Sequence, residues 1–258
     1  MHDYLRPNAG WRHEHFMSLP DQSPIQRLSV EEGLDAERLL LERVSAGSLE
    51  CALLLWRPLD SALVMPRRLS RQADFDAARH ECAARGWPVA LRDTGGEPVP
   101  QSAAVLNIAL AYALPVWEDE ATRIETAYLR LCKPLQHWLH RLDLCSNLGE
   151  VAGAFCDGRY NVNLEHRKLV GTAQRWRRRQ SDGRCVVLAH AAVLMENQRQ
   201  SMVEVVNTFY LQCGIQISCR QDSHVALDEV VAGAWSMAGK LYACYRQHLS
   251  RTELTLGP

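Results

Sequence analysis

The chain has 258 residues, of which 47% are apolar and 23% are charged, so it can bury one good-sized core or two small ones. Its formal net charge of −1 gives no electrostatic reason to expect nucleic acid or an anionic membrane as a partner. No stretch reaches the roughly 18 uninterrupted apolar residues that a membrane span requires. Residues 1–20 carry charged side chains where a signal peptide would be apolar, so we expect a cytoplasmic protein.

Helix and strand patterns alternate along the first half of the chain. Ser29 and Glu32 form a capping-box pattern that predicts a helix over residues 29–44. Short apolar runs at 51–56 and 62–65, with a polar turn between them, predict two buried strands. The next predicted elements are a helix over 74–85 ended by Gly86, strands over 88–91 and 104–113, and a long helix between 115 and 143 that contains Pro134.

The second half predicts a meander of antiparallel strands followed by helices. The strands are expected at 160–164, 168–176 and 185–194, and the helices at 201–212 and within 227–249. The sum is an α+β fold, a single domain whose mixed, largely antiparallel β-sheet is flanked by helices. We expect a poorly structured N-terminal tail over residues 1–28, the folded domain over 29–250 and a C-terminal tail over 251–258.

Nine cysteines are spread along the chain without a CxxC pair or a Cys/His cluster, so we expect no metal site. In a reducing compartment most of them are expected to be small buried apolar residues. Cys156 differs because Gly153 and Gly158 surround it, and small turn-forming residues favour an exposed sulfur. Lys168 follows twelve residues later, before the small-residue run that begins at Gly171.

A second candidate segment follows the predicted strand 88–91. Adjacent glycines, Gly95 and Gly96, allow close approach of the backbone to a ligand, although a tight hairpin is the simpler interpretation of a Gly-Gly pair taken alone. His190 alternates along an apolar strand and is by itself an ordinary core histidine.

Together the two segments resemble the biotin/lipoate protein ligase superfamily, in its lipoate ligase and octanoyltransferase branch, over roughly residues 30 to 250. In that branch a strand leads into an Arg-x-Thr/Ser-Gly-Gly turn, and a later Lys is followed by Gly, a small residue, Ala or Ser, and Gln. The residues that match are Arg92, Thr94, Gly95 and Gly96 in the turn, and Lys168, Gly171, Thr172, Ala173 and Gln174 in the later run.

The nearest resemblance is to the cysteine-dependent amidotransferases that move an octanoyl group between lipoyl-type carriers. Their Cys-x-Gly-x-Tyr-Asp/Asn element is matched at residues 156–161, and their Val-Leu-Asn run at residues 105–107. The resemblance implies that Cys156 is the catalytic nucleophile and that Lys168 binds the acyl carbonyl. It implies substrate contacts from Arg92, Thr94, Gly95, Gly96, Asn107, Gly158, Tyr160, Asn161, Gly171, Thr172, Ala173, Gln174 and His190.

The expected function is therefore transfer of an octanoyl or lipoyl group, through a thioester on Cys156, to the lysine of a lipoyl-domain or H-protein-type carrier, with no cofactor required. A nearby ammonium such as that of Lys168 would lower the thiol pKa and stabilise the oxyanion. The basic run Arg175–Arg179 is interpreted as a solvated turn, with phosphate or base binding and the steering of an acidic carrier as its alternatives.

Two other functions stay open. An ATP-dependent lipoate ligase, using ATP and Mg²⁺, would form an acyl-adenylate and need no cysteine, and Gly158–Asn161 partly echo its Gly-Arg-Asn-Asp element. A non-catalytic carrier-binding or acyl-binding protein is the other. It is consistent with the altered turn, in which Glu97–Ser102 follow Gly96 where relatives have a third glycine.

Overall fold

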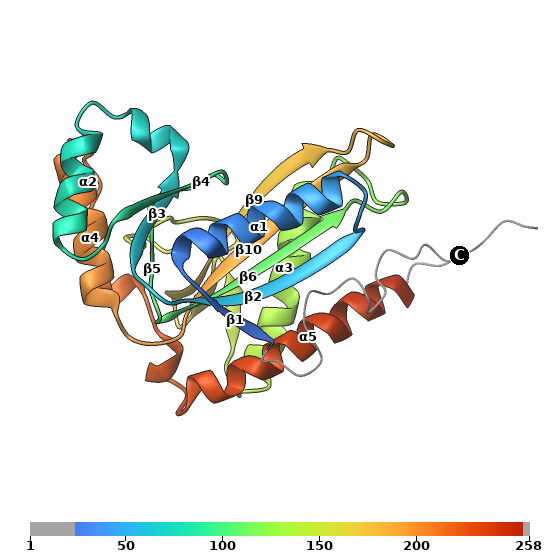
Figure 1. Ribbon diagram of the computed structural model, residues 1–258. Coiled ribbons are helices and arrows are strands. Elements are labelled where there is room, and N and C mark those ends of the chain that lie inside the picture. Colours follow the sequence, from blue (N-terminus) through green and yellow to red (C-terminus); the bar gives the residue numbers. More distant parts are fainter. Residues whose placement is uncertain (1–23, 255–258) are drawn as a thin grey trace, which may run out of the picture.

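The structure is a computed structural model that describes residues 24–254. Its larger sheet has seven strands in the order β1-β2-β6-β10-β9-β8-β7, and every pairing in it is antiparallel except that of β1 with β2. The strands are β1 (Ile25–Leu28), β2 (Cys51–Pro58), β6 (Val105–Ala113), β7 (Ser146–Leu148), β8 (Val162–Leu164), β9 (Arg167–Arg178) and β10 (Cys185–Leu194). The α+β class and the largely antiparallel sheet are as predicted (Figure 1).

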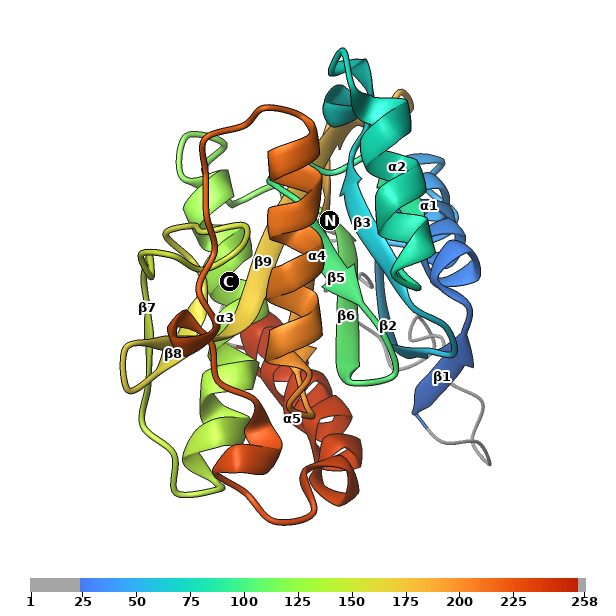
Figure 2. The ribbon, with the colours of Figure 1, turned by 90° about the vertical axis from the view of Figure 1, so that its left-hand side faces the viewer.

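A second sheet of three strands stands beside the first, in the order β4-β3-β5. It comprises β3 (Ala62–Pro66), β4 (Val89–Arg92) and β5 (Val99–Gln101). The strands β2 and β3 were both predicted, but they belong to different sheets, because β3 pairs with β4 and β5 and not with β2. Figure 2 shows the smaller sheet in front of the larger one.

Helices cover both sheets. They are α1 (Val30–Ser45), α2 (Phe75–Ala84), α3 (Arg123–His140), α4 (Arg199–Gln212) and α5 (Ala234–Leu254), with short 3₁₀ turns η3 (Arg67–Arg71), η4 (Gln221–Ser223) and η5 (Leu227–Glu229). One face of the larger sheet packs against α1, and the other packs against α3 and α5. The smaller sheet packs against α2 and α4 (Figures 1 and 2).

The predicted helix start at Ser29 is confirmed by its hydrogen bonds. The Ser29 hydroxyl accepts the amide of Glu32 at 3.2 Å, and the Glu32 carboxylate accepts the amide of Ser29 at 2.8 Å. This capping box fixes where α1 begins, and α1 in turn carries Glu37 to the space between the sheets.

The ends of the predicted domain differ from the structure. Residues 25–28 were assigned to an N-terminal tail, but they form β1, which pairs in parallel with β2. Such a short strand has little pattern of its own and is stabilised by hydrogen bonds to β2, which local sequence does not reveal. At the other end α5 continues to Leu254, past the predicted boundary at residue 250. Residues 1–23 and 255–258 lie outside the described residues.

No helix among residues 24–254 is long and apolar enough to cross a lipid bilayer.

Candidate active site

A cavity lies between the two sheets and contains about 480 Å³ of space, part of it open to solvent. Strands of both sheets and helix α1 contribute to its walls. Seven of the predicted site residues line it: Arg92, Asn107, Cys156, Gly171, Thr172, Ala173 and His190. The structure therefore brings together residues from five separate parts of the chain.

Cys156 lies on the long connection between β7 and β8 and is partly exposed. Its φ is +50°, in the left-handed region that is uncommon for residues other than glycine. Its Sγ accepts a hydrogen bond from the backbone amide of Glu97 at 3.2 Å. The Glu97 amide therefore fixes the position of the sulfur at the cavity wall.

Arg92 ends β4 and stabilises the turn that faces Cys156. Its guanidinium donates to the carbonyl oxygens of Val64 at 3.2 Å, Gly95 at 3.0 Å and Glu97 at 2.8 Å. Burial lowers the pKa of Arg92, and the neighbouring Cys156 sulfur acts in the opposite direction. The guanidinium therefore fixes the turn whose Glu97 amide binds the sulfur.

Two polar atoms near this turn have no hydrogen-bond partner in the described chain. They are Nε of Arg92 and Oγ1 of Thr94, and both are buried. Unpaired buried polar atoms cost free energy unless a ligand or water pairs with them. Both atoms belong to residues that were predicted to contact substrate, and they are available for such a contact.

Lys168 is 3% exposed, and it holds the loop that carries Cys156. Its ammonium donates to the carbonyl oxygens of Phe155 at 2.6 Å and Cys156 at 2.7 Å. Burial lowers the pKa of Lys168, and the nearby Cys156 and Asp157 oppose this shift. In the described state the ammonium thus binds loop carbonyls, and one of its three N–H groups remains for another acceptor.

Gly171 leaves the space that the Lys168 ammonium occupies. A Cβ at residue 171 would lie 3.2 Å from both Cε and Nζ of Lys168. Lys168 does not line the main cavity but lines an adjacent, mostly apolar one, which shares Val99, Gly171 and Ala192 with it. The two cavities therefore adjoin at Gly171.

Eight of the predicted site residues do not line the main cavity: Thr94, Gly95, Gly96, Gly158, Tyr160, Asn161, Lys168 and Gln174. Gly158 and Asn161 donate hydrogen bonds to the Asp157 carboxylate, at 2.9 and 3.2 Å. The Tyr160 carbonyl accepts the Thr172 hydroxyl at 3.0 Å, so this residue ties the Cys156 loop to β9. Gln174 binds the carbonyl of Ile124 at 3.0 Å and is likewise directed away from the cavity.

A buried polar cluster on the cavity wall, centred on Glu37, was not predicted from the sequence. Glu37 of α1 is 4% exposed, and its carboxylate accepts Nε1 of Trp56 at 3.0 Å and pairs with Nδ1 of His190 at 2.9 Å. All three side chains line the cavity. His190 thus lies on the cavity wall, as predicted. Glu37 was not predicted, because the sequence around it shows only the pattern of an ordinary helix.

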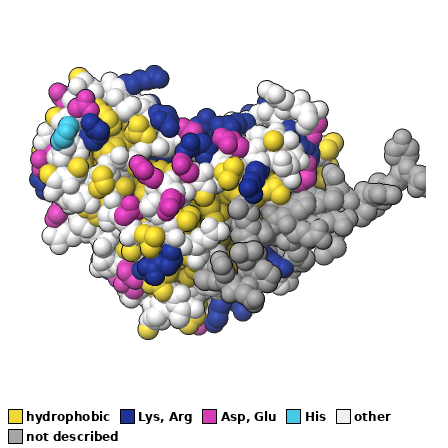
Figure 3. Space-filling view, in the orientation of Figure 1, with side chains coloured by type: hydrophobic (Ala, Val, Ile, Leu, Met, Phe, Trp, Pro, Cys, Tyr) yellow, Lys and Arg dark blue, Asp and Glu magenta, His cyan; other side chains and the backbone are white. Residues whose placement is uncertain are grey.

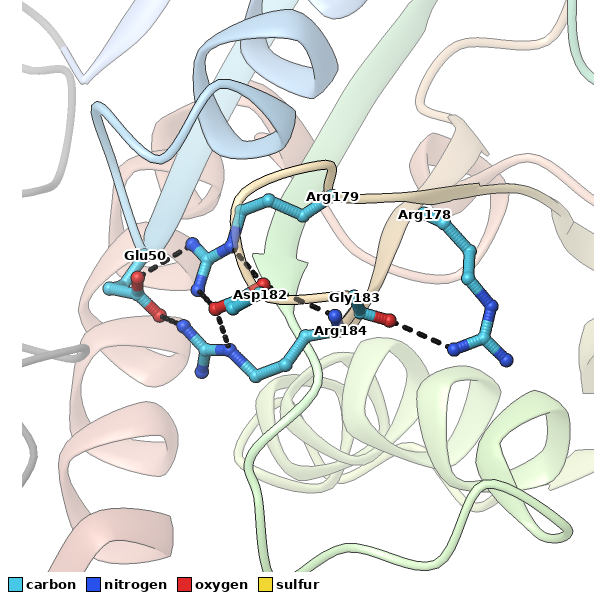
Figure 4. Close-up of polar contacts among 6 residues, drawn as sticks. All are labelled: Glu50, Arg178, Arg179, Asp182, Gly183 and Arg184. Carbon is cyan, nitrogen blue, oxygen red and sulfur yellow. Dashed lines mark hydrogen bonds and ion pairs between the residues drawn. The ribbon is translucent and has the colours of Figure 1, made fainter.

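The basic run at the end of β9 is largely neutralised inside the molecule. Arg179 and Arg184 both pair with Glu50 and Asp182, and Arg178 donates to the carbonyl of Gly183 at 2.8 Å (Figure 4). The Arg179 side chain is only 4% exposed, so this part of the predicted solvated turn is buried. Arg179 can be buried because the carboxylates of Glu50 and Asp182 pair with its guanidinium and offset the cost of desolvation.

Basic side chains that are exposed or partly exposed line a groove next to the main cavity. The groove shares Leu34, Glu37 and Arg92 with that cavity and is also lined by Arg38, Arg67, Arg175 and Arg177. Lys and Arg side chains gather, with some Asp and Glu, on the upper surface in Figure 3. Asp93 pairs with Arg67 and Arg175 and offsets part of the charge.

Residues 29–237, most of the described chain, match the family model of the lipoyl protein ligase A/B catalytic domain. The chain belongs to this family. The family lies within the superfamily that the Arg92 turn and the Lys168 run suggested.

Curated relatives of this lipoyl protein ligase A/B family chain include an uncharacterized protein of Cupriavidus necator. It is 40% identical over 172 residues, which cover 63% of this chain and 66% of the relative. An octanoyl-[GcvH]:protein N-octanoyltransferase of Kyrpidia tusciae is 29% identical over 188 residues, which cover 71% of this chain and 63% of the relative. The chain thus spans slightly less than two thirds of the length of both relatives.

Solved structures of lipoate ligases have the same fold. A lipoate-protein ligase A bound with ATP has a TM-score of 0.61 at 16% identity, covering 88% of this chain and 84% of that one. A bipartite lipoate protein ligase from Thermoplasma acidophilum, described with its E2 lipoyl domain, has a TM-score of 0.58 at 14% identity, covering 90% of this chain and 83% of that one. At these identities the likeness shows the fold alone.

In this family member the turn that follows Gly96 is shaped around Cys156. The Glu97 carboxylate pairs with Arg68, whose guanidinium also binds the Gly96 carbonyl at 2.7 Å. The Glu97 amide faces the Cys156 sulfur. Glu97 therefore presents its backbone, and not its charge, to the sulfur.

Gly96→Ala is expected to lower the free energy of unfolding by about 1–3 kcal/mol, because φ is +100° and only glycine adopts this backbone readily. The new Cβ would lie 2.9 Å from the Cys156 sulfur and would displace it. The matched control is Gly95→Ala, whose Cβ would meet nothing within 4 Å. Urea unfolding checks the prediction, and equal stability of the two variants would contradict it.

Proposed function

We propose that this chain is a cysteine-dependent acyltransferase that moves an octanoyl or lipoyl group to the lysine of a lipoyl-domain or H-protein-type carrier. The observation that carries the proposal is the position of Cys156. Its sulfur lies on the wall of the cavity, accepts the Glu97 amide, and has the buried Arg92 guanidinium beside it. Similarity to proteins named octanoyl-[GcvH]:protein N-octanoyltransferases supports the same class of reaction.

In the first step the Cys156 thiolate attacks the carbonyl carbon of an acyl-lysine amide on the donor carrier. The carbon–sulfur bond forms, the carbon–nitrogen bond breaks, and the donor lysine leaves as an amine after it takes up a proton. In the second step the lysine amine of the acceptor attacks the thioester, loses a proton, and releases the thiolate. One amide replaces another, so the exchange needs no external source of energy.

Lys168 is suited to the charge that develops during both steps. Attack on a carbonyl places negative charge on its oxygen, and a prepositioned donor stabilises that charge. The ammonium already spans the Phe155 and Cys156 carbonyls, next to the sulfur-bearing residue. Its third N–H is the group that we assign to the acyl oxygen.

The cavity also suits a medium-length acyl chain. Its lining includes Leu34, Trp56, Val64, Val99, Ala191 and Ala192. Clefts with mostly apolar walls and a few polar groups are typical of small-molecule sites. The chain would extend from the Cys156 thioester into this space.

An acyl-transfer assay without nucleotide tests the proposal. The full chain is mixed with an octanoylated H-type carrier and an apo lipoyl domain, and the mass of the lipoyl domain is followed. We expect a gain of one octanoyl group per acceptor lysine. A parallel reaction contains free octanoate, ATP and Mg²⁺ in place of the acylated carrier.

The alternatives predict different results in that assay. Acylation only from free octanoate with ATP and Mg²⁺ would show an ATP-dependent ligase and contradict the proposal. Binding of a carrier without transfer in either reaction would show a non-catalytic protein.

A further inference from the structure

His224 is a buried histidine that belongs to neither sequence motif. It follows η4, is 1% exposed, and forms an isolated parallel bridge with Lys168 of β9. Each of the two residues binds a backbone group of Phe155, the residue before Cys156.

The hydrogen bonds of His224 define its tautomer. Nδ1 lies 2.9 Å from the carbonyl oxygen of Arg220, and a carbonyl oxygen can only accept, so Nδ1 carries the proton. Nε2 therefore has a free lone pair in the neutral ring, and it accepts the backbone amide of Phe155 at 3.1 Å. The imidazole also stacks on the Phe155 ring, with centroids 4.1 Å apart and planes 23° apart.

The Phe155–Cys156 segment is thus held from two directions. His224 binds the amide of Phe155, while Lys168 binds the carbonyls of Phe155 and Cys156. Cys156 needs such support because its φ of +50° is unfavourable for a residue with a side chain. Backbone strain persists where surrounding contacts fix it, and these contacts do so.

We propose that His224, as the neutral Nδ1–H tautomer, is a positioning residue that holds the Cys156 sulfur against the Glu97 amide. This inference rests on the proposed function for its catalytic meaning. The positioning effect on the Cys156 thiol does not depend on that function, because it can be measured as the reactivity of the thiol without any acyl transfer. Loss of the hydrogen bond from the Phe155 amide to His224 would free the loop and move the Cys156 sulfur away from the Glu97 amide.

Protonation of His224 would disrupt the same contact. It would place an N–H on Nε2, opposite the Phe155 N–H, so two donors would face each other. The charged groups around the ring are Lys168 from β9, Arg199 from α4, which donates to the His224 carbonyl, and Asp222 in its own turn. Burial, and then the Lys168 charge, lower the pKa of His224 to about 4.

The sign of the pH effect follows from this shift. The unfolded chain binds a proton on His224 near pH 6.5, and the folded chain near pH 4. Between these values the unfolded state binds more protons, so the contribution of His224 to stability falls as the pH falls through that window. Above pH 6.5 the ring is neutral in both states, and the loop contact is intact.

The experiment compares three variants of the full chain by the rate at which iodoacetamide alkylates Cys156, measured across pH by peptide mass spectrometry. His224→Phe keeps a stacking ring but has no acceptor, and His224→Gln keeps an acceptor. His80→Phe is the matched control, because His80 is exposed and its Nδ1 also contacts a backbone carbonyl, that of Asp76.

We expect His224→Phe to slow alkylation of Cys156 at pH 7 by about fivefold or more, because the sulfur is no longer held against its amide donor. His224→Gln should restore most of the rate, and His80→Phe should match wild type. Acyl transfer by His224→Phe should fall through kcat with an unchanged KM for the carrier.

A Cys156 profile in His224→Phe equal to that of wild type would overturn the positioning role, even if the variant were less stable. If wild type transfers no acyl group while His224→Phe still changes Cys156 reactivity, the proposed function fails and the positioning role stands.

Discussion

Cys156→Ala is expected to lower the rate of acyl transfer by about a thousandfold or more, because the variant has no atom that can form the thioester. The fold should be unaffected, since Cys156 is only partly buried and its loop is held through backbone groups. The measurement is acyl transfer between carriers, with thermal unfolding recorded in parallel.

Cys213→Ala is the matched control for this prediction. Cys213 is also a free, partly exposed cysteine, but it follows α4 and lines neither cavity. It should keep wild-type activity. A Cys156→Ala protein that retained activity within about tenfold of wild type would show that the acyl group does not pass through this sulfur.

Lys168→Met is expected to reduce kcat by about a hundredfold or more, the usual effect of removing one donor from a developing oxyanion. Methionine keeps much of the apolar stem and volume, so the substitution removes mainly the ammonium. The Phe155 and Cys156 carbonyls also lose their partner, so the loop should become more mobile.

Two further variants make the lysine result specific. Lys133→Met removes an exposed lysine of α3 and should leave transfer unchanged. Lys168→Arg keeps the charge, but its larger head group would meet Gly171, where an added Cβ would already lie 3.2 Å from Nζ. It should therefore remain as slow as Lys168→Met, whereas full activity in Lys168→Arg would mean that a positive charge without defined geometry is sufficient.

Helices and strands that have a capping motif or a long apolar run of their own could be predicted from the sequence. The capping box at Ser29 placed the start of α1, and the apolar runs of β6 and β10 placed the strands that form the centre of the larger sheet. The strands β5 and β7 were missed, because each has three residues and too short a pattern to recognise.

The candidate site was predictable only where a motif named its residues. Cys156, Lys168 and Arg92 were found because glycines accompany them in recognisable order. Glu37 was not found, because its partner His190 lies 153 positions away and only folding brings them together. His224 was also missed, because its role depends on the path of the Phe155 backbone and not on its own neighbours in sequence.

The central claim is that Cys156 carries the acyl group, and an intact-mass measurement tests it most directly. The full chain is incubated with an octanoylated H-type carrier, without acceptor and without ATP, and is then analysed before and after hydroxylamine. We predict one octanoyl adduct that maps to Cys156 and is released by hydroxylamine, as a thioester is. The absence of an adduct, an adduct on another residue, or one that forms only when ATP is added would contradict this mechanism.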